Sequence, residues 1–213
     1  LQFGAEGSKV FAKTVLMDPR FAYAHDNGDI HIHDLDFYAT GTLTCCQTDP
    51  LKLFANGGFN TGHGHLRTPN SIASYAALAA IILQANQNEQ HGGQSIPNFD
   101  YAMAPGVNKS FKKALRSNLE KYNKYSGKKV DIKIPDDIAY GDTETLKKLK
   151  VPETVIETSN DDVEKQTFQA MEGFIHNLNT MHSRAGAQVP FTSINFGTDT
   201  TPAGRLVSKS LLE

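Results

Sequence analysis

Strong helical patterns alternate with short segments of strand character along this chain of 213 residues. Residues 30–38, IHIHDLDFY, alternate apolar and polar side chains with the period of a strand or extended segment. Residues 186–197, GAQVPFTSINFG, have the β-branched and aromatic content of a buried strand and are bounded by glycines. Helix patterns cover residues 71–90, 111–122 and 162–181. This alternation predicts an α/β fold.

The segment that follows residue 67 carries the clearest helix signals. Thr68 is suited to cap a helix and Pro69 to open its first turn, while Gly92-Gly93 would end it. Apolar residues surround nearly the whole circumference from Ile72 to Leu83. A helix of this kind is either buried within one domain or placed at a subunit interface, and the sequence favours neither.

For two further helices, the sequence predicts which side faces solvent or the core. The helix at 111–122 has a basic polar face, and an acidic stretch at 136–164 follows it. Because the two signs nearly cancel, we interpret both as solvent-exposed faces rather than a nucleic-acid surface. The helix at 162–181 is predicted to bury one face, formed by Phe168, Met171, Ile175, Leu178 and His182. A last helix starts at Thr201-Pro202 and reaches the end, so we expect the chain to be part of a longer polypeptide.

Composition and charge exclude several classes of protein. The net charge of -2 argues against a surface that neutralises nucleic-acid phosphates. No apolar run approaches the roughly 20 residues that a membrane span requires, and the first residues lack the apolar core of a secretory signal. The two cysteines, Cys45 and Cys46, are neighbours, which rarely form a disulfide. We therefore expect a reduced, cytoplasmic protein without a membrane partner.

The cysteine pair allows three interpretations. Neighbouring residues of a strand point in opposite directions, so Cys45 and Cys46 cannot readily bind one metal ion, although His31 and His33 lie close in the sequence. Burial as small apolar side chains is the simplest interpretation of the cysteines. The small hydroxyl residues around them, such as Thr44, instead favour an accessible thiol that takes part in redox or hydrogen-atom chemistry.

Candidates for anion binding lie beside the helices. The chain has neither the glycine motif of a P-loop nor that of a Rossmann fold. Loop 58–71 brings Arg67 and Ser71 to the start of a helix, where free N–H groups attract anions, but ordinary helix capping also explains Ser71. Arg184 and Gln188 lie at a helix-to-strand junction, where substrate contacts gather in α/β barrels.

Four blocks of sequence, in this order, resemble the anaerobic, class III ribonucleoside-triphosphate reductases, which are glycyl radical enzymes. The blocks are HIHDLDFYATGTLTCCQ, GGFNTGHGHLRTPNSI, QNEQHGGQSIPNFD and HSRAGAQVPFTSINFGTDTTPAGR. The similarity extends over nearly the whole chain and is weakest from about Ser110 to Asp161. Four ordered blocks are far more specific than a single motif.

The resemblance implies a fold and a reaction. The fold would be a ten-stranded α/β barrel with a finger loop through its centre, and residues 1–213 would form the first part of this catalytic barrel. The enzyme would reduce ribonucleoside triphosphates to deoxyribonucleoside triphosphates for DNA synthesis and repair. In the family, a glycyl radical generates a cysteine thiyl radical, and a second cysteine on an early strand joins the reduction, commonly with formate as the donor. The position that matches this second cysteine is Cys46, which makes Cys45 the outward-facing neighbour.

The resemblance also implies ligands and partners. His31 would orient the substrate, with core packing as its alternative, and Arg67, Ser71 and Gln188 would contact the triphosphate. No metal site is expected in this chain. The parent enzyme would carry a glycyl radical installed by an activating enzyme that uses S-adenosylmethionine and an iron–sulfur cluster, and a structural zinc. It would form a homodimer regulated allosterically by deoxynucleotides and ATP.

Other parts of the family pattern are missing from this chain. It contains no RVxGY-type glycyl radical segment, no CxxC pairs for the structural zinc and no finger-loop cysteine, and it shows no ATP-binding regulatory domain. We therefore expect the chain alone to be inactive as a reductase. The rival interpretations are another glycyl radical enzyme of the formate-lyase or diol-dehydratase type, a non-catalytic nucleotide-binding regulatory module, and a metal-binding protein.

Overall fold

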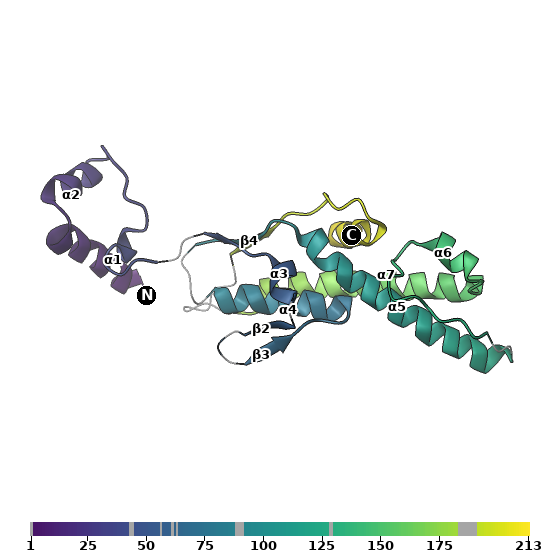
Figure 1. Ribbon diagram of the computed structural model, residues 1–213. Helices are drawn as coiled ribbons and strands as arrows, with labels where there is room; N and C mark the ends of the chain where they lie inside the picture. The colour runs from purple at the N-terminus through teal and green to yellow at the C-terminus, as the bar shows by residue number, and fades with distance from the viewer. Residues whose placement is uncertain are drawn as a thin grey trace. The chain divides into compact units, whose positions relative to one another are not determined.

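The computed structural model describes residues 2–42, 45–55, 57–60, 62, 64–87, 92–127, 130–182 and 191–213. The described residues form two compact units (Figure 1). The described residues up to Cys45, together with Gly92, belong to the first unit, and those from Cys46 onward belong to the second. Each unit has a hydrophobic core of its own.

The first unit consists of short helices around a small core. Its elements are α1 (Gln2–Phe11), the π-helical turn η1 (Ala12–Leu16), α2 (Pro19–Asp26) and the 3-10 turn η2 (Leu35–Phe37). Asp18 caps α2 by accepting the N–H of Arg20, with Pro19 at the first helical position. Ala12, Met17 and Leu35 form the core.

Of the two predictions for residues 30–38, a strand or an extended segment, the strand is wrong. Residues 30–32 are irregular, and Asp34 adopts a positive φ of 52°, which no strand allows. The N–H of Ile32 pairs with Nδ1 of His25 at 3.2 Å instead of with a neighbouring strand. The 3-10 turn then buries Leu35. The apolar alternation reflects a loop that packs locally on helices.

The second unit contains a small parallel sheet of three strands. Its strands are β1 (Cys46–Gln47), β4 (Gln94–Ile96) and β5 (Thr192–Ile194), in the order β1-β4-β5. β2 (Gly58–Asn60) and β3 (His65–Arg67) form a separate antiparallel pair. The predicted α/β class is confirmed, and β5 lies inside the segment predicted as a buried strand. β4 was not predicted, because the glycines that precede it and the amide side chains around it are typical of a turn.

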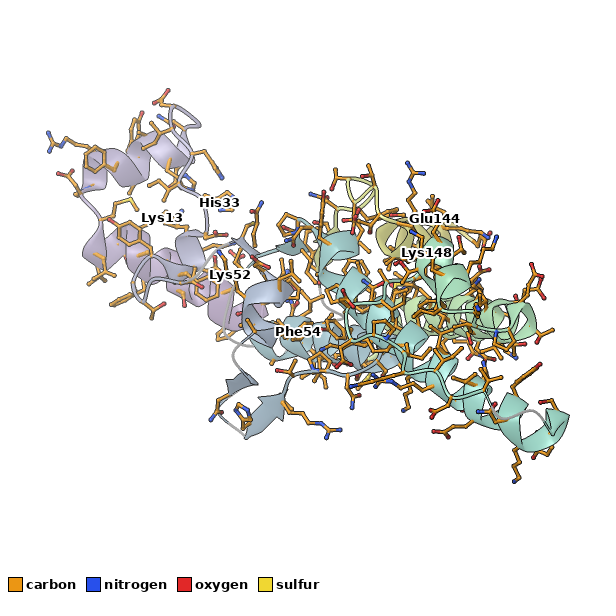
Figure 2. The ribbon with its side chains drawn as sticks, turned by 45° about the vertical axis from the view of Figure 1, so that its right-hand side comes forward. Lys13, His33, Lys52, Phe54, Glu144 and Lys148 are labelled. Carbon is orange, nitrogen blue, oxygen red and sulfur yellow. The ribbon has the colours of Figure 1, made fainter. Side chains whose placement is uncertain are left out.

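Among the described residues, the second unit contains six helices. They are α3 (Pro50–Phe54), α4 (Ile72–Asn86), α5 (Phe99–Ser126), α6 (Thr143–Lys148), α7 (Glu153–Thr180) and α8 (Pro202–Leu212). α4, α5, α7 and α8 pack against one another and bury the main core of the second unit (Figure 1). Phe54, labelled in Figure 2, packs edge-on against the ring of Tyr75 on α4, with 5.1 Å between ring centroids.

The ends of α4 differ from those predicted. Ser71, not Thr68, caps the helix, and its hydroxyl exchanges hydrogen bonds with Ser74 in a capping box. The Thr68 hydroxyl donates to the carbonyl of Phe54 instead. The helix ends at Asn86, before the predicted glycine stop. Its apolar surface is partly exposed, since Ile81 keeps 38% of its surface in contact with solvent.

The buried face predicted for the helix at 162–181 is also partly wrong. Phe168 and Ile175 are exposed, whereas Thr167, Met171 and Phe174 are buried. The helix starts nine residues earlier than predicted, at Glu153, and packs between α4, α5 and α8. Because three helices contact α7, its buried residues do not form the single apolar stripe that the sequence spacing predicted. The predicted start of α8, with Thr201 as its cap, is confirmed.

The contact between α4 and α5 requires a glycine at position 106. A Cβ atom there would lie 2.9 Å from the ring of Tyr75 and 3.1 Å from the backbone of Ile72. We expect Gly106→Ala to lower the free energy of unfolding by about 1–3 kcal/mol, because backbone cannot move aside as a flexible side chain does. Gly173→Ala on α7, where nothing lies within 4 Å, is the matched control and should raise it by about 0.5–1 kcal/mol. Denaturant unfolding of both variants measures this, and equal effects would contradict it.

In the part of the chain that the structure describes, no helix is both long and apolar enough to cross a bilayer.

Candidate functional site

Cys46 lies on the side of the sheet that faces helix α4. It is in register with Gln94 on β4, which is in turn in register with Thr192 on β5. Register partners of parallel strands point to the same face, so these three side chains form one row. Two residues further along β4, Ile96 points the same way and is fully buried in the core. The row therefore belongs to the helix-covered face.

The Cys46 thiol is half-buried and contacts a side-chain amide. Nδ2 of Asn86, at the end of α4, donates to Sγ of Cys46 at 3.2 Å and to Oε1 of Gln94 at 2.9 Å. Cys45 is exposed. Neither cysteine takes part in a disulfide. The thiol is thus partly accessible and held beside polar groups.

The amide groups behind Cys46 continue into the core. Nε2 of Gln94, which is only 2% exposed, donates to the carbonyl of Leu83 at 2.7 Å and to Oε1 of Gln87 at 3.0 Å. Three amide side chains and one thiol therefore form a connected chain of hydrogen bonds between β1, β4 and α4. These bonds satisfy the Gln94 amide and Oε1 of Gln87, whereas Nε2 of Gln87 is buried without a hydrogen-bond partner among the described residues.

The opposite face of the sheet is also polar. Gln47, Ser95 and Ser193 are in register across the three strands. They alternate with the Cys46 row, so they point away from α4. Gln47 and Ser193 are exposed and Ser95 is half-buried. The residues of this face are polar, whereas the opposite face includes Ile96, which is buried in the core.

Arg67 borders a cavity of about 420 Å³ between β3 and the start of α4. Its lining also includes His65, Asn70, Ser74 and Leu78. Arg67 itself is exposed on β3. Half of the lining residues are apolar, namely Leu66, Pro69, Ala77 and Leu78, so Arg67 is the charged group of a mostly apolar cavity.

Ser71 and its neighbours use their hydroxyl groups to cap α4. The N–H of Ser74 donates to the Ser71 hydroxyl at 3.3 Å, and the N–H of Ile72 donates to the Ser110 hydroxyl at 2.9 Å. Hydroxyl groups therefore already occupy helix N–H groups that would attract a phosphate. Ordinary capping, the alternative that the sequence left open, is what the structure shows for Ser71.

His31 belongs to the first unit, where it lies between two other imidazole rings. Its ring centroid is 5.7 Å from that of His25 and 6.0 Å from that of His33. Nδ1 of His33, labelled in Figure 2, lies 2.7 Å from the Asp34 carboxylate. Among the described residues, no group of three or more His, Cys, Asp or Glu is arranged to hold a metal ion. Gln188 and its neighbour Arg184 lie outside the described residues.

Asp100 is a buried carboxylate that the sequence analysis did not single out. It lies in the first turn of α5 and accepts the N–H groups of Tyr101, Gly197 and Asp199 at 2.8–3.0 Å. Burial by itself raises the pKa of a carboxyl group, but these backbone donors outweigh it and hold the pKa of Asp100 below its ordinary value. Asp100 thereby fixes the loop that follows β5 to the start of α5.

Comparison with known proteins places the chain in a family. A family model described as anaerobic ribonucleoside-triphosphate reductase matches residues 1–213. The chain belongs to the anaerobic ribonucleoside-triphosphate reductase family. This confirms the resemblance carried by the four sequence blocks.

Curated relatives with the name anaerobic ribonucleoside-triphosphate reductase are similar over almost the whole chain. The relative from Escherichia coli (strain K12) is 28% identical over 205 residues, which are 96% of this chain and 25% of the relative. The relative from Enterobacteria phage T4 is 30% identical over 208 residues, 97% of this chain and 29% of its own length. The relative from Haemophilus influenzae is 27% identical over 206 residues. The chain thus spans between a quarter and a third of the length of these reductases.

Proposed function

We propose that the full-length protein containing this chain reduces ribonucleoside triphosphates to deoxyribonucleoside triphosphates, and that this chain forms the first part of its catalytic barrel. The observation that carries the proposal is the family match across all 213 residues. Helices cover the outside of such barrels, and the Cys46 row faces α4, so the proposed catalytic role of Cys46 rests on the family match and not on the orientation of the sheet. The match favours this activity over the formate-lyase and regulatory alternatives.

Cys46 is the proposed catalytic residue of this chain. It lies on the first strand of the parallel sheet, half-buried, with an amide donor at its sulfur. In the proposed reaction, the ribonucleotide loses its 2′-hydroxyl as water while formate is oxidised to carbon dioxide, with one proton consumed. The Cys46 thiol supplies hydrogen during this reduction. A glycyl radical, installed by an activating enzyme, would supply the radical chemistry from outside this chain.

Four residues remain proposed contacts of the substrate. Arg67 has the strongest support, because its guanidinium borders a cavity large enough for part of a triphosphate. Ser71 lies at the same end of α4, although its hydroxyl serves the helix cap. His31 would orient the substrate, and Gln188 would contact its phosphates.

Exposed apolar side chains support the proposed homodimer. Ile81 on α4 and Phe168 and Ile175 on α7 are each between 38% and 39% exposed on two helices that pack together. Ile81→Asp is therefore a suitable probe of dimer formation, whereas Ala80, at 2% exposure, belongs to the core and would report folding. Deoxynucleotides and ATP are the proposed allosteric effectors.

An anaerobic turnover assay tests the proposed function. The full-length protein, activated to carry its glycyl radical, should form deoxyribonucleoside triphosphate from ribonucleoside triphosphate with formate present. Carbon dioxide should appear from labelled formate in equal amount. Activated protein that carries the radical but forms no deoxyribonucleotide with formate or with a dithiol reductant would contradict the proposal.

A further inference from the structure

The amide chain beside Cys46 has a direction that one backbone carbonyl determines. The Leu83 carbonyl can only accept a hydrogen bond, so the Gln94 group that contacts it must be the amide nitrogen. The other end of the Gln94 amide, Oε1, is then an acceptor, and it faces Asn86 at 2.9 Å. Asn86 must therefore present its nitrogen. This assignment follows from the network and needs no observed hydrogen positions.

The same direction reaches the sulfur. Nδ2 of Asn86 carries two hydrogens, and its two partners are Gln94 Oε1 and Cys46 Sγ. Because Asn86 donates at this contact, the sulfur accepts, and the S–H hydrogen cannot point at Asn86. An N–H donor also stabilises negative charge on the sulfur more than it stabilises the neutral thiol.

We propose that Asn86 and Gln94 are positioning residues that hold the Cys46 sulfur as a hydrogen-bond acceptor and direct its S–H hydrogen away from α4. Gln94 acts through Asn86 and does not touch the sulfur. The catalytic consequence rests on the proposed role of Cys46: a thiol that must supply hydrogen to a substrate is held with that hydrogen free. The hydrogen-bond direction itself rests only on the geometry of the second unit.

Alkylation of Cys46 tests this arrangement. We would use the full-length protein with Cys45→Ala and follow the reaction of iodoacetamide with the Cys46 peptide by mass spectrometry across a pH series. Asn86→Leu keeps a side chain of similar size but removes the donor. It should slow alkylation at neutral pH about two- to threefold, because loss of one hydrogen bond of about 1 kcal/mol disfavours the reacting thiolate about fivefold but makes it about twofold more nucleophilic, and it should raise the limiting rate at alkaline pH about twofold. Asn86→Asp should slow it further, because a carboxylate repels the thiolate.

Two further variants separate positioning from loosened packing. Gln94→Leu should also slow alkylation, although less, because Asn86 is then free to turn its oxygen towards the thiol. Gln84→Leu is the matched control, since Gln84 on α4 donates its amide to the carbonyl of Asn177 and not to Cys46. It should leave the pH profile as in the parent. Thermal unfolding of each variant verifies that it is folded at the assay temperature.

The outcomes distinguish this inference from the proposed function. An unchanged pH profile in folded Asn86→Leu, or an equal change in Gln84→Leu, would overturn the positioning role even in an active reductase. A slower profile in Asn86→Leu alone supports the role even if the wild-type protein proves unable to reduce ribonucleotides. The infrared S–H band of the Cys46 thiol provides a second measurement, and its frequency should differ between wild type and Asn86→Leu but not Gln84→Leu.

Discussion

In the full-length protein, replacing Cys46 by alanine should reduce the proposed reductase turnover by roughly a thousandfold or more, the size of effect expected when a group with its proposed role in the chemistry is removed. The S–H bond is weak enough to give up hydrogen to a carbon radical, and neither a methyl group nor an alcohol replaces it. Cys46→Ser should therefore be as inactive as Cys46→Ala. The measurement is formation of deoxyribonucleotide under anaerobic conditions.

Cys45→Ala is the matched control for this prediction. Cys45 is exposed and its side chain does not belong to the row that faces α4, so turnover should stay within a fewfold of wild type. The electron paramagnetic resonance signal of the glycyl radical should persist in both variants, which verifies that each is folded and activated. Loss of turnover in Cys45→Ala with retention in Cys46→Ala would reverse the assignment of the two thiols.

The largest expected effect on stability comes from Asp100. Asp100→Ala would remove the acceptor of the Asp199 N–H group, which is buried, and of the Tyr101 and Gly197 N–H groups, which are partly buried. Hydrogen bonds to a charged group contribute about 1.5–3 kcal/mol each, with the partly buried pair contributing less, so the free energy of unfolding should fall by about 3 kcal/mol. Asp100→Asn retains one acceptor oxygen and should lose about half as much. Denaturant unfolding measures both, with exposed Asp137→Asn as the control.

The lowered pKa of Asp100 predicts how the stability of the protein changes in acid. Its pKa is below the ordinary value of 3.8 in the folded protein, so the unfolded chain binds this proton first as the pH falls. The stabilisation by the carboxylate is therefore complete above about pH 4 and is lost as the pH falls through the lowered native pKa. Asp100→Asn should show a smaller loss of stability between about pH 5 and pH 2 than wild type. Parallel curves for the two proteins would show that Asp100 does not contribute.

Local sequence signals were sufficient for several elements. The Thr201-Pro202 pair marks the start of α8 because a hydroxyl cap and a fixed φ act within one turn. Residues 192–194 of the β-branched segment form the strand β5, although this strand is half-buried to exposed and not buried as predicted. The α/β class follows from the alternation of such elements, and the four ordered blocks were enough to assign the family.

Other features depend on contacts between distant residues. β4 has little strand propensity of its own, and it becomes a strand because β1 and β5 pair with it on both sides. Asp34 turns a segment with strand alternation into a 3-10 turn. The face of α7 depends on three neighbouring helices, so Phe168 is exposed although its sequence spacing predicted burial.

The class of fold, the family and the cysteine pair in which the chemistry is proposed could be predicted from the sequence, because periodicity, capping and ordered motifs are local properties of the chain. The groups that surround the thiol could not be predicted, because they come from distant parts of the chain. Asn86 and Gln94 are 40 and 48 residues from Cys46, and the pairing of β1 with β4 brings them together. Loop closure over such distances is specified by the packing of the whole unit, so no local pattern could have identified the amide chain.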